Sequence, residues 1–350
     1  MVKRFVFAVP GDLATPTGGY AYDRRMIAEL GDLGWQVDLL SLGEGFPWPS
    51  EATRTAALTK LLAIPAGHAI VVDGLALGVL PEAATQLVGR NPLLALVHHP
   101  LALEAGLSEN QALALRSSER AALSAVRGVV VTSAATARLV AAEYDVPAES
   151  ITIARPGSDP APLAAGSRDG VVRLLSVGAV VPRKGFDVLI AALATLGDLP
   201  WQLTIAGDRT RDLNAAAQLD ADIAGHALEN RVAVLGGVSP EHLATLYAEA
   251  DVFALASHFE GYGMAYAEAV AHGLPVIGTT GGAIPDTVPS DAGLLVPPGD
   301  MPALAKALRL IIGDGDLRQI LAGGARAAAP QLPTWRQSVE IFARRLEMLA

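Results

Sequence analysis

The chain has 350 residues, 51% of them apolar, no cysteine, and a formal net charge of −10. This length suffices for two α/β domains of ordinary size, each with its own buried core. The acidic balance argues against a nucleic-acid-binding protein and against attachment to an anionic membrane. The lack of cysteine excludes disulfides and thiolate metal sites.

The N-terminal stretch MVKRFVFAVPGD has two basic residues and a short apolar run that ends in a Pro-Gly pair. This run is too short for a secretory signal and predicts a first β-strand. The most apolar region, 61–80, contains Pro65, His68 and Asp73, and so is not a membrane span. We therefore expect a cytoplasmic protein, monomeric or weakly dimeric.

Short apolar strands alternate with amphipathic helices from the start of the chain. Among the predicted helices are residues 20–33 and 109–126, and the last covers about 334–349. The predicted strands of the first half are Arg4–Val9, Gln36–Ser41, Ala69–Val72, Leu93–Val97, Gly128–Thr132 and Ile151–Ala154. Those of the second half are Val171–Val177, Trp201–Ala206, Val232–Leu235, Val252–Ala256, Pro275–Gly278 and Gly293–Val296. This alternation is typical of parallel sheets with helices on both faces.

A stretch rich in Pro, Gly and Ser, residues 155–170, has no apolar period and predicts a linker. We expect a first Rossmann-like domain over 1–165 and a second over 166–330. A C-terminal helix in 331–350 is expected to cross back to the first domain. The fold class is thus α/β, with two doubly wound domains and an interdomain cleft where a ligand binds.

A basic turn follows the first strand of the second half, in SVGAVVPRKGFDVLIAAL. The strand ends at Gly178, and a helix is expected to begin near Lys184. Arg183 and Lys184 would then lie at a helix N-terminus, where a diphosphate could join them. The chain has only four lysines, which makes an internal one conspicuous. A solvated basic pair is the alternative.

A glycine-rich turn opens SHFEGYGMAYAEAVAHGLPVI. The helix after it is apolar nearly all round, which predicts burial of Glu268 and therefore a hydrogen-bonded or neutralised carboxylate. Ribose hydroxyls are suitable donors to Glu268, and a cap on a neighbouring loop is the alternative. Glu260 lies in the turn itself. Two further glycine pairs follow strands, in TTGGAIPDTV and in PGDLATPTGGY, and each could cradle a nucleotide or be an ordinary loop.

Two histidines, His98 and His99, follow the apolar strand of LVHHPLALE directly. Adjacent side chains diverge, and no further histidine or carboxylate has a sequence spacing that would complete a metal site, so we expect none here. One imidazole could contact a sugar hydroxyl; a helix-capping or core histidine is the alternative.

Taken together, these motifs resemble glycosyltransferase family 4, whose members have the two-lobed GT-B fold and use nucleotide-sugar donors. The specific part is the E-x7-E spacing from Glu260 to Glu268, with the KG turn upstream and GGAIPDTV downstream. The resemblance implies a retaining hexosyltransferase in which the domain over 1–165 is on the acceptor side and the domain over 166–330 binds the nucleotide-sugar donor. The chain departs from the family at Ala179, where an arginine is common.

The resemblance also implies roles for individual residues. Lys184, Glu260, His99 and Arg183 would be the catalytic set, with Lys184 on the diphosphate, Glu260 on the transferred sugar, and His99 or His98 near its 6-position. Residues that the resemblance places around the donor are Gly18, Gly19, Gly178, Gly261, Tyr262, Gly263, Met264, Glu268, Gly237, Val238 and Leu246.

In the reaction that we expect, a nucleoside diphosphate leaves the anomeric carbon and cations stabilise its developing charge. No candidate nucleophile stands out, so attack from the leaving-group face with retention is favoured. No cofactor and no metal are expected, since the cations make a divalent ion unnecessary. UDP-sugars are favoured over GDP-sugars, with a small molecule or glycan as acceptor. A non-catalytic nucleotide-sugar sensor and a sugar-nucleotide epimerase are the alternatives.

Overall fold

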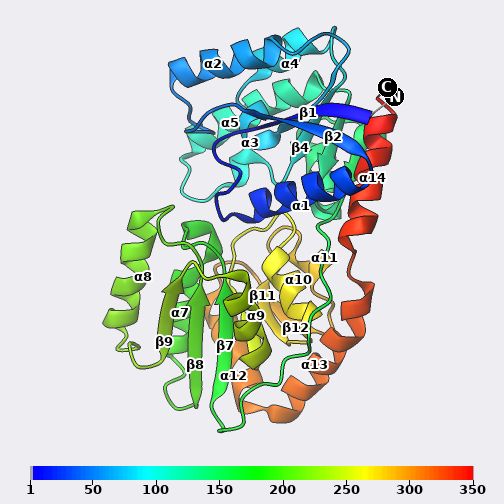
Figure 1. The fold of residues 1–350 in the computed structure, drawn as a ribbon. Coiled ribbons are helices and arrows are strands. Elements are labelled where there is room, and N and C mark those ends of the chain that lie inside the picture. The colour runs from blue at the N-terminus through cyan, green and yellow to red at the C-terminus, as the bar shows by residue number, and fades with distance from the viewer. Residues whose placement is uncertain (1–2, 350) are drawn as a thin grey trace. The chain divides into compact units, whose positions relative to one another are not determined.

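A computed structural model describes residues 3–349. The chain divides into two compact units, residues 1–157 with 333–350, and residues 158–332. Each unit has one six-stranded parallel sheet with helices packed against it (Figure 1). No helix in the described part of the chain combines the length and the apolar character that a membrane span needs.

The sheet of the first unit has the strand order β2-β1-β3-β4-β5-β6. Its strands are β1 (Lys3–Val9), β2 (Trp35–Ser41), β3 (Ala69–Asp73), β4 (Leu93–Val97), β5 (Gly128–Val131) and β6 (Ile151–Ile153). Its α-helices are α1 (Gly18–Asp32), α2 (Glu51–Leu62), α3 (Gly74–Leu77), α4 (Pro81–Leu87), α5 (Glu109–Ser124), α6 (Ala134–Glu143) and α14 (Trp335–Glu347). A 3₁₀ turn, η1 (Leu101–Leu103), follows β4, and another, η2 (Ala148–Ser150), precedes β6.

The sheet of the second unit has the order β12-β11-β10-β7-β8-β9. Its strands are β7 (Val172–Val177), β8 (Trp201–Ala206), β9 (Val232–Gly236), β10 (Val252–Ala254), β11 (Val276–Thr279) and β12 (Gly293–Val296). Its helices are η3 (Pro182–Lys184), α7 (Phe186–Ala194), α8 (Leu213–Gly225), α9 (Pro240–Glu249), α10 (Met264–Ala271), α11 (Ile284–Thr287), α12 (Met301–Gly313), α13 (Gly315–Ala328) and η4 (Ala329–Gln331).

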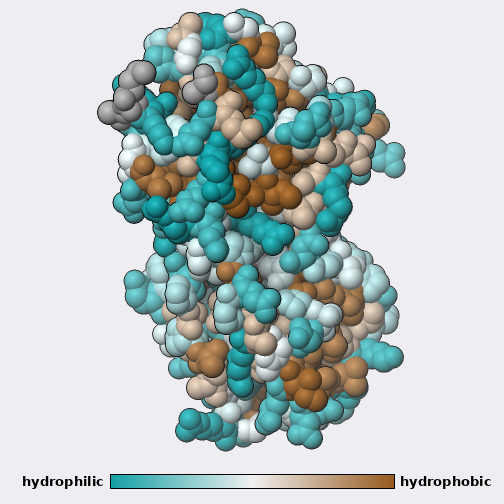
Figure 2. Space-filling view, turned by 90° about the vertical axis from the view of Figure 1, so that its right-hand side faces the viewer, coloured by the Kyte–Doolittle hydropathy of each residue, from teal (hydrophilic) through white to brown (hydrophobic). Residues whose placement is uncertain are grey.

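All twelve predicted strands are present, and the prediction of two doubly wound Rossmann-like domains is confirmed. Strands β3, β4 and β5 are apolar on both faces and almost wholly buried, as strands of a parallel sheet covered by helices should be. Each unit has its own large apolar cluster between sheet and helices. On the face drawn in Figure 2, apolar side chains form separate patches among polar ones.

The last helix, α14, belongs to the first unit and packs beside α1 (Figure 1). Two capping contacts fix where it begins: the Thr334 side chain accepts from the Gln337 amide, and the Gln337 side chain accepts from the Thr334 amide. Its Trp335 lies against Gly157, where any side chain would collide with the Trp335 backbone. The chain therefore re-enters the first unit at a close, fixed contact.

The start of the helix after the basic turn differs from the prediction. The basic turn forms the 3₁₀ turn η3, and α7 begins only at Phe186. Gly185 separates the two, with a left-handed backbone (φ 64°) that favours glycine. The first turn of α7 therefore contains Asp187, as the helix dipole prefers, and the two cations precede it.

Candidate functional site

In the second unit, the chain reverses its direction of travel across the sheet between β7 and β10. From β7 it proceeds through β8 to β9, and then returns to β10 on the other side of β7. Such a switch point, at the carboxyl ends of the strands, is where ligands bind in open α/β sheets. The turn with Arg183 and Lys184 follows β7, and the turn with Glu260 follows β10.

Glu260 holds these two turns together. Its Oε1 lies 2.6 Å from Lys184 Nζ and its Oε2 lies 3.1 Å from Arg183 Nη1. Ser257 Oγ donates a further hydrogen bond of 2.6 Å to Oε1, and Arg183 Nη1 also donates to the Phe259 carbonyl at 2.7 Å. All three ionic side chains are largely buried.

The charges in this cluster decide the protonation state of Glu260. Burial alone would raise its pKa, but the positive charges of Lys184 and Arg183 outweigh burial and lower the pKa to about 2. Glu260 is therefore ionised at neutral pH. Two positive charges against one negative leave the cluster with a net charge of +1, which suits an anionic ligand.

Glycines let the cluster form. A side chain at Gly185 would come within 2.2 Å of the Ala256 carbonyl oxygen, so the start of α7 can pack closely on the chain after β10. The aliphatic stem of Lys184 lies over Gly178, where a Cβ would be 3.1 Å from Lys184 Cε. Gly178 thus provides the surface along which the lysine reaches Glu260.

The loop that carries Glu260 is fixed from its other side by the glycine pair after β11. Residues Glu260 and Gly282 form an isolated parallel bridge, and the Ala283 amide donates to the Glu260 carbonyl at 2.8 Å. A side chain at Gly282, whose φ is 63°, would come within 2.2 Å of that carbonyl. The GGAIPDTV turn therefore positions Glu260.

Two helices at this sheet edge begin in the same unusual way. Of the fourteen α-helices within residues 3–349, ten have a side chain that accepts from a first-turn amide, and two others have proline in the first turn. The remaining two, α7 and α10, begin at left-handed glycines, Gly185 and Gly263, with no side-chain cap. Uncapped N-termini are suited to oxygen-rich or anionic ligands.

Glu268 lies on α10, and its partner is a tyrosine of α9. The Tyr247 hydroxyl donates a hydrogen bond of 2.9 Å to Glu268 Oε2. Burial raises the pKa of Glu268, while this hydrogen bond lowers it. The Tyr247 ring stacks on His272, with 4.9 Å between ring centroids, so the tyrosine is held in place. One oxygen of Glu268 is thus occupied within the protein.

The residues predicted beside the nucleotide base follow β9, at the same carboxyl edge. Gly236 ends the strand with a φ of 71°, and its carbonyl accepts from the Gly207 amide at 2.8 Å. Gly237 and Val238 form the turn into α9, which carries the half-buried Leu246. An open backbone stretch thus leads into a partly apolar helix face.

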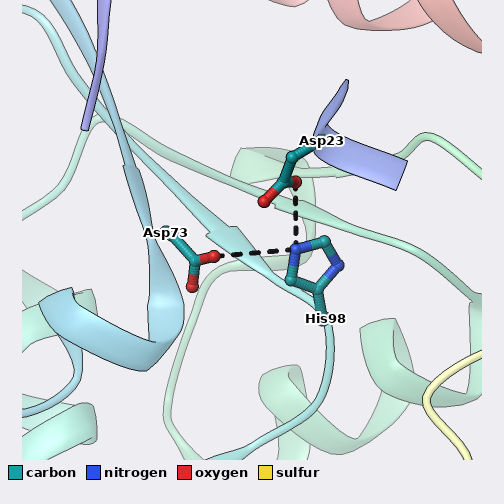
Figure 3. Close-up of side chains that lie close together, drawn as sticks. All are labelled: Asp23, Asp73 and His98. Carbon is teal, nitrogen blue, oxygen red and sulfur yellow. Dashed lines mark ion pairs between the residues drawn. The ribbon is translucent and has the colours of Figure 1, made fainter. Parts of the chain in front are cut away.

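The first unit has a polar cluster of its own, made of Asp23, Asp73 and His98 (Figure 3). His98 Nε2 lies 3.1 Å from Asp23 Oδ1 and 3.9 Å from Asp73 Oδ2. Burial disfavours charge on the His98 ring, but the two aspartates outweigh it and raise its pKa to about 9. Burial, followed by the charge of Asp23, raises the pKa of Asp73 to about 7.

The glycine pair of the first unit lies beside this cluster. Gly18 and Gly19 form the start of α1, capped by Thr17, and a Cβ on Gly19 would be 3.3 Å from the His98 ring. The neighbouring His99 has a different environment, with its Nε2 3.3 Å from Glu104 Oε2.

Comparison with known proteins identifies the second unit. Residues 164–328 match the model of the family described as glycosyl transferases group 1. These residues form a glycosyl transferases group 1 domain. The cluster of Arg183, Lys184 and Glu260 lies within this group 1 domain, as does Glu268, which is half-buried where the sequence predicted full burial.

A curated relative extends this similarity. The amylovoran biosynthesis glycosyltransferase AmsK of Erwinia amylovora is 35% identical over 214 residues, which cover 57% of this chain and 52% of AmsK. The chain therefore spans about half the length of that relative.

Solved structures show the fold of both units. Sucrose-phosphate synthase from Thermosynechococcus elongatus has a TM-score of 0.81 at 22% identity, over 99% of both chains. HepE from Anabaena in complex with UDP and glucose has a TM-score of 0.76 at 19% identity, over 97% of this chain and 99% of HepE. The chain has the GT-B fold.

The predicted residues thus fall into two groups. Those of the group 1 domain gather along one sheet edge: Gly178, Arg183, Lys184, Gly237, Val238, Leu246, Glu260, Gly261, Tyr262, Gly263, Met264 and Glu268. In the first unit, Gly19 lies against His98, Gly18 precedes it at the start of α1, and His99 lies beside Glu104. The roles assigned to all of these residues remain predictions.

Several residues that the sequence did not single out complete these arrangements. Ser257 and Tyr247 hydrogen-bond the two glutamates of the E-x7-E motif. Asp23 and Asp73 meet His98, although no sequence spacing predicted it. Asp73 directly follows the predicted strand Ala69–Val72, which is a signal for a site residue, whereas Asp23 is one polar residue among several on an amphipathic helix.

Proposed function

We propose that the chain is a retaining, metal-independent glycosyltransferase of family 4, which transfers a hexose from a UDP-sugar to a hydroxyl acceptor. One observation carries the proposal: a net positive, largely buried cluster lies at the switch point of a group 1 domain, beside two uncapped helix N-termini. UDP is favoured because HepE, which shares the fold, was solved with UDP and glucose.

The donor diphosphate would bind against Lys184, Arg183 and the first amides of α7. An ammonium has three N–H donors and a guanidinium five, so each group can bond Glu260 and a phosphate at the same time. Glu260 would hold both cations in place before the donor arrives. Such preorganised charge stabilises a developing anion without reorganisation during the reaction.

The sugar and the nucleoside would occupy the rest of this edge. The amides of Tyr262 and Gly263 at the start of α10 would hold sugar hydroxyls, together with Gly261 and Met264. Glu268 would accept from the ribose hydroxyls while Tyr247 holds its other oxygen. Gly237, Val238 and Leu246 would flank the base. From the first unit, the amides of Gly18 and Gly19 would contact phosphate, and His98 or His99 the sugar.

In the reaction, the bond between the anomeric carbon and the β-phosphate oxygen breaks, and its electron pair stays on UDP. Lys184 and the α7 amides would stabilise that charge. The acceptor oxygen attacks from the same face, and its proton passes to the departing phosphate. The anomeric configuration is thereby retained. The cations at the diphosphate would stabilise its negative charge, as a divalent ion does in other nucleotide-sugar enzymes, so no step needs a metal.

An assay of UDP release, with and without a panel of hydroxyl acceptors, tests this function. We expect release from a UDP-sugar to depend strictly on one class of acceptor, and the product to retain the anomeric configuration by NMR. Interconversion of donor sugars would indicate an epimerase, and donor binding without turnover would indicate a sensor. A thermal-shift screen of nucleotide sugars should come first, since it selects the donor.

A further inference from the structure

We propose that Asp23, Asp73 and His98 form a binding site for one divalent transition-metal ion of the Zn²⁺ or Mn²⁺ type. The three side chains converge from different elements: α1, the end of β3 and the residue after β4. Figure 3 shows both carboxylates directed at the same nitrogen of the imidazole. Together they offer one nitrogen and two oxygen ligands.

The distances fit metal ligation. Ligands at 2.0–2.2 Å from a tetrahedral ion lie about 3.4 Å apart. Here His98 Nε2 is 3.1 Å from Asp23 Oδ1 and 3.9 Å from Asp73 Oδ2, and all three ligand atoms lie within 4.8 Å of one another. Small side-chain rotations would bring the atoms to equal distances from one ion.

The state of Asp23 is an independent reason to expect a cation. The residue is wholly buried, and among the described residues neither of its carboxylate oxygens accepts a hydrogen bond of acceptable geometry. His98 Nε2 is near enough but is not aligned for one. Apart from the ion pair with His98, Asp23 has no donor among the described residues, and buried carboxylates are normally fully paired or bound to a metal. A divalent ion would neutralise both aspartates while His98 binds as a neutral ligand.

The position of the cluster in the fold also favours a ligand. The first unit reverses its direction of travel between β1 and β3, and Asp73 ends β3 at this switch point. Asp23 belongs to the helix that follows β1. The carboxyl ends of strands at a switch point are where open α/β sheets bind ligands.

The ligand set defines the chemistry of the ion. Mixed nitrogen and oxygen ligands suit Zn²⁺, Mn²⁺ and similar ions better than the hard, all-oxygen sites that Ca²⁺ prefers. Three protein ligands leave at least one position for water or for an oxygen of a bound ligand. The site uses none of Lys184, Arg183 and Glu260, and His98 is the one ligand that the proposed function also places near the sugar. Metal binding and UDP binding are therefore measured separately, and either can fail without the other.

Isothermal titration of the chelator-treated full chain with Zn²⁺, and then with Mn²⁺, tests the site. We expect one ion per chain. Asp23→Asn, Asp73→Asn and His98→Gln should each weaken binding by about 100-fold or more, since lost outer-shell partners alone cost 10–100-fold. The matched control His99→Gln changes the adjacent histidine, outside the cluster, and should bind as the wild type does.

Two measurements on the wild type keep the test decisive if a variant does not fold. Zn²⁺ should shift the ¹⁵N resonance of His98 Nε2, and the increase in melting temperature given by UDP should survive chelation. No binding of either ion by the folded wild type, or equal binding by His98→Gln, would overturn the proposal. The cluster would then be a charged imidazolium between two carboxyl groups.

Discussion

At the scale of single residues, Glu260 has a different surrounding from the one that its motif suggests. The resemblance implies a side chain that contacts the transferred sugar, but the carboxylate is buried and holds Lys184 and Arg183. The anion expected beside the two cations is therefore partly supplied by the protein. Together the three side chains carry a net charge of +1, which is less than the charge of two bare cations.

Replacing the lysine tests this residual charge. Lys184→Ala should lower turnover by about 100-fold or more, the scale of losing one stabiliser of developing charge. The matched control is Lys306→Ala, which removes an exposed lysine from α12 and should leave turnover unchanged. Steady-state rates with saturating donor make the comparison. Near-wild-type turnover of Lys184→Ala would exclude its proposed role.

Glu268 should act on donor binding and not on chemistry. Glu268→Ala is expected to weaken UDP affinity by about 10-fold or more, as expected when a hydrogen bond to a charged group is lost. Turnover at saturating donor should change much less. Tyr247→Phe serves as a control for structural effects. It removes the hydrogen-bond partner of Glu268 but keeps the Glu268 carboxylate that is proposed to bind the ribose. A fall in turnover with intact UDP affinity would contradict the ribose assignment.

At the scale of elements, the start of α7 depends on one glycine. Gly185→Ala would put a residue with a side chain into a left-handed backbone conformation and press its Cβ against the Ala256 carbonyl oxygen. We therefore expect the unfolding free energy of the second unit to fall by about 2 kcal/mol or more. Gly323→Ala, within α13 and with nothing within 4 Å of the new Cβ, should stabilise the chain by about 0.5–1 kcal/mol. Urea unfolding measures both, and a harmless Gly185→Ala would contradict the packing described here.

A buried carboxylate on α5 anchors the turn that follows His99. Glu119 Oε2 accepts from the Leu101 amide at 2.9 Å, and burial raises the pKa of Glu119 to about 8 despite this bond. The folded state therefore favours the protonated form, whereas the unfolded chain ionises near the ordinary value of 4.5. Stability from this residue is complete below the unfolded pKa and is lost as pH rises toward 8.

Glu119→Gln should remove this dependence. Relative to the variant, we expect the wild type to lose up to about 1.4 kcal/mol of unfolding free energy per pH unit between about pH 5 and pH 8. Urea denaturation at several pH values in this range would show it. Parallel stability curves for the two proteins would mean that Glu119 does not take up a proton on folding.

At the scale of the whole molecule, the fold could be predicted because its signals are local. Buried strands such as β4 are continuous apolar runs between polar turns, and those that end at Val97, Ala206 and Val296 ended where predicted. The start of α7 was placed two residues early, because the restraint on Gly185 comes from Ala256, a distant part of the chain.

The difference between local signals and contacts with distant parts of the chain also explains which site residues could be predicted from the sequence. Glu260 and Glu268 belong to one continuous motif, so their sequence spacing revealed them. Their partner Tyr247 lies on another helix, and Asp23 and Asp73 reach His98 only through the order of strands in the sheet. The interdomain cleft stays a prediction.

A crystal structure of the chain with bound UDP tests the central claim most directly. The account predicts the β-phosphate within hydrogen-bond distance of Lys184 Nζ and of the first amides of α7, with Glu260 still bonded to Arg183 or Lys184. A pyrophosphate bound at any other place, with this cluster closed by Glu260 alone, would contradict it.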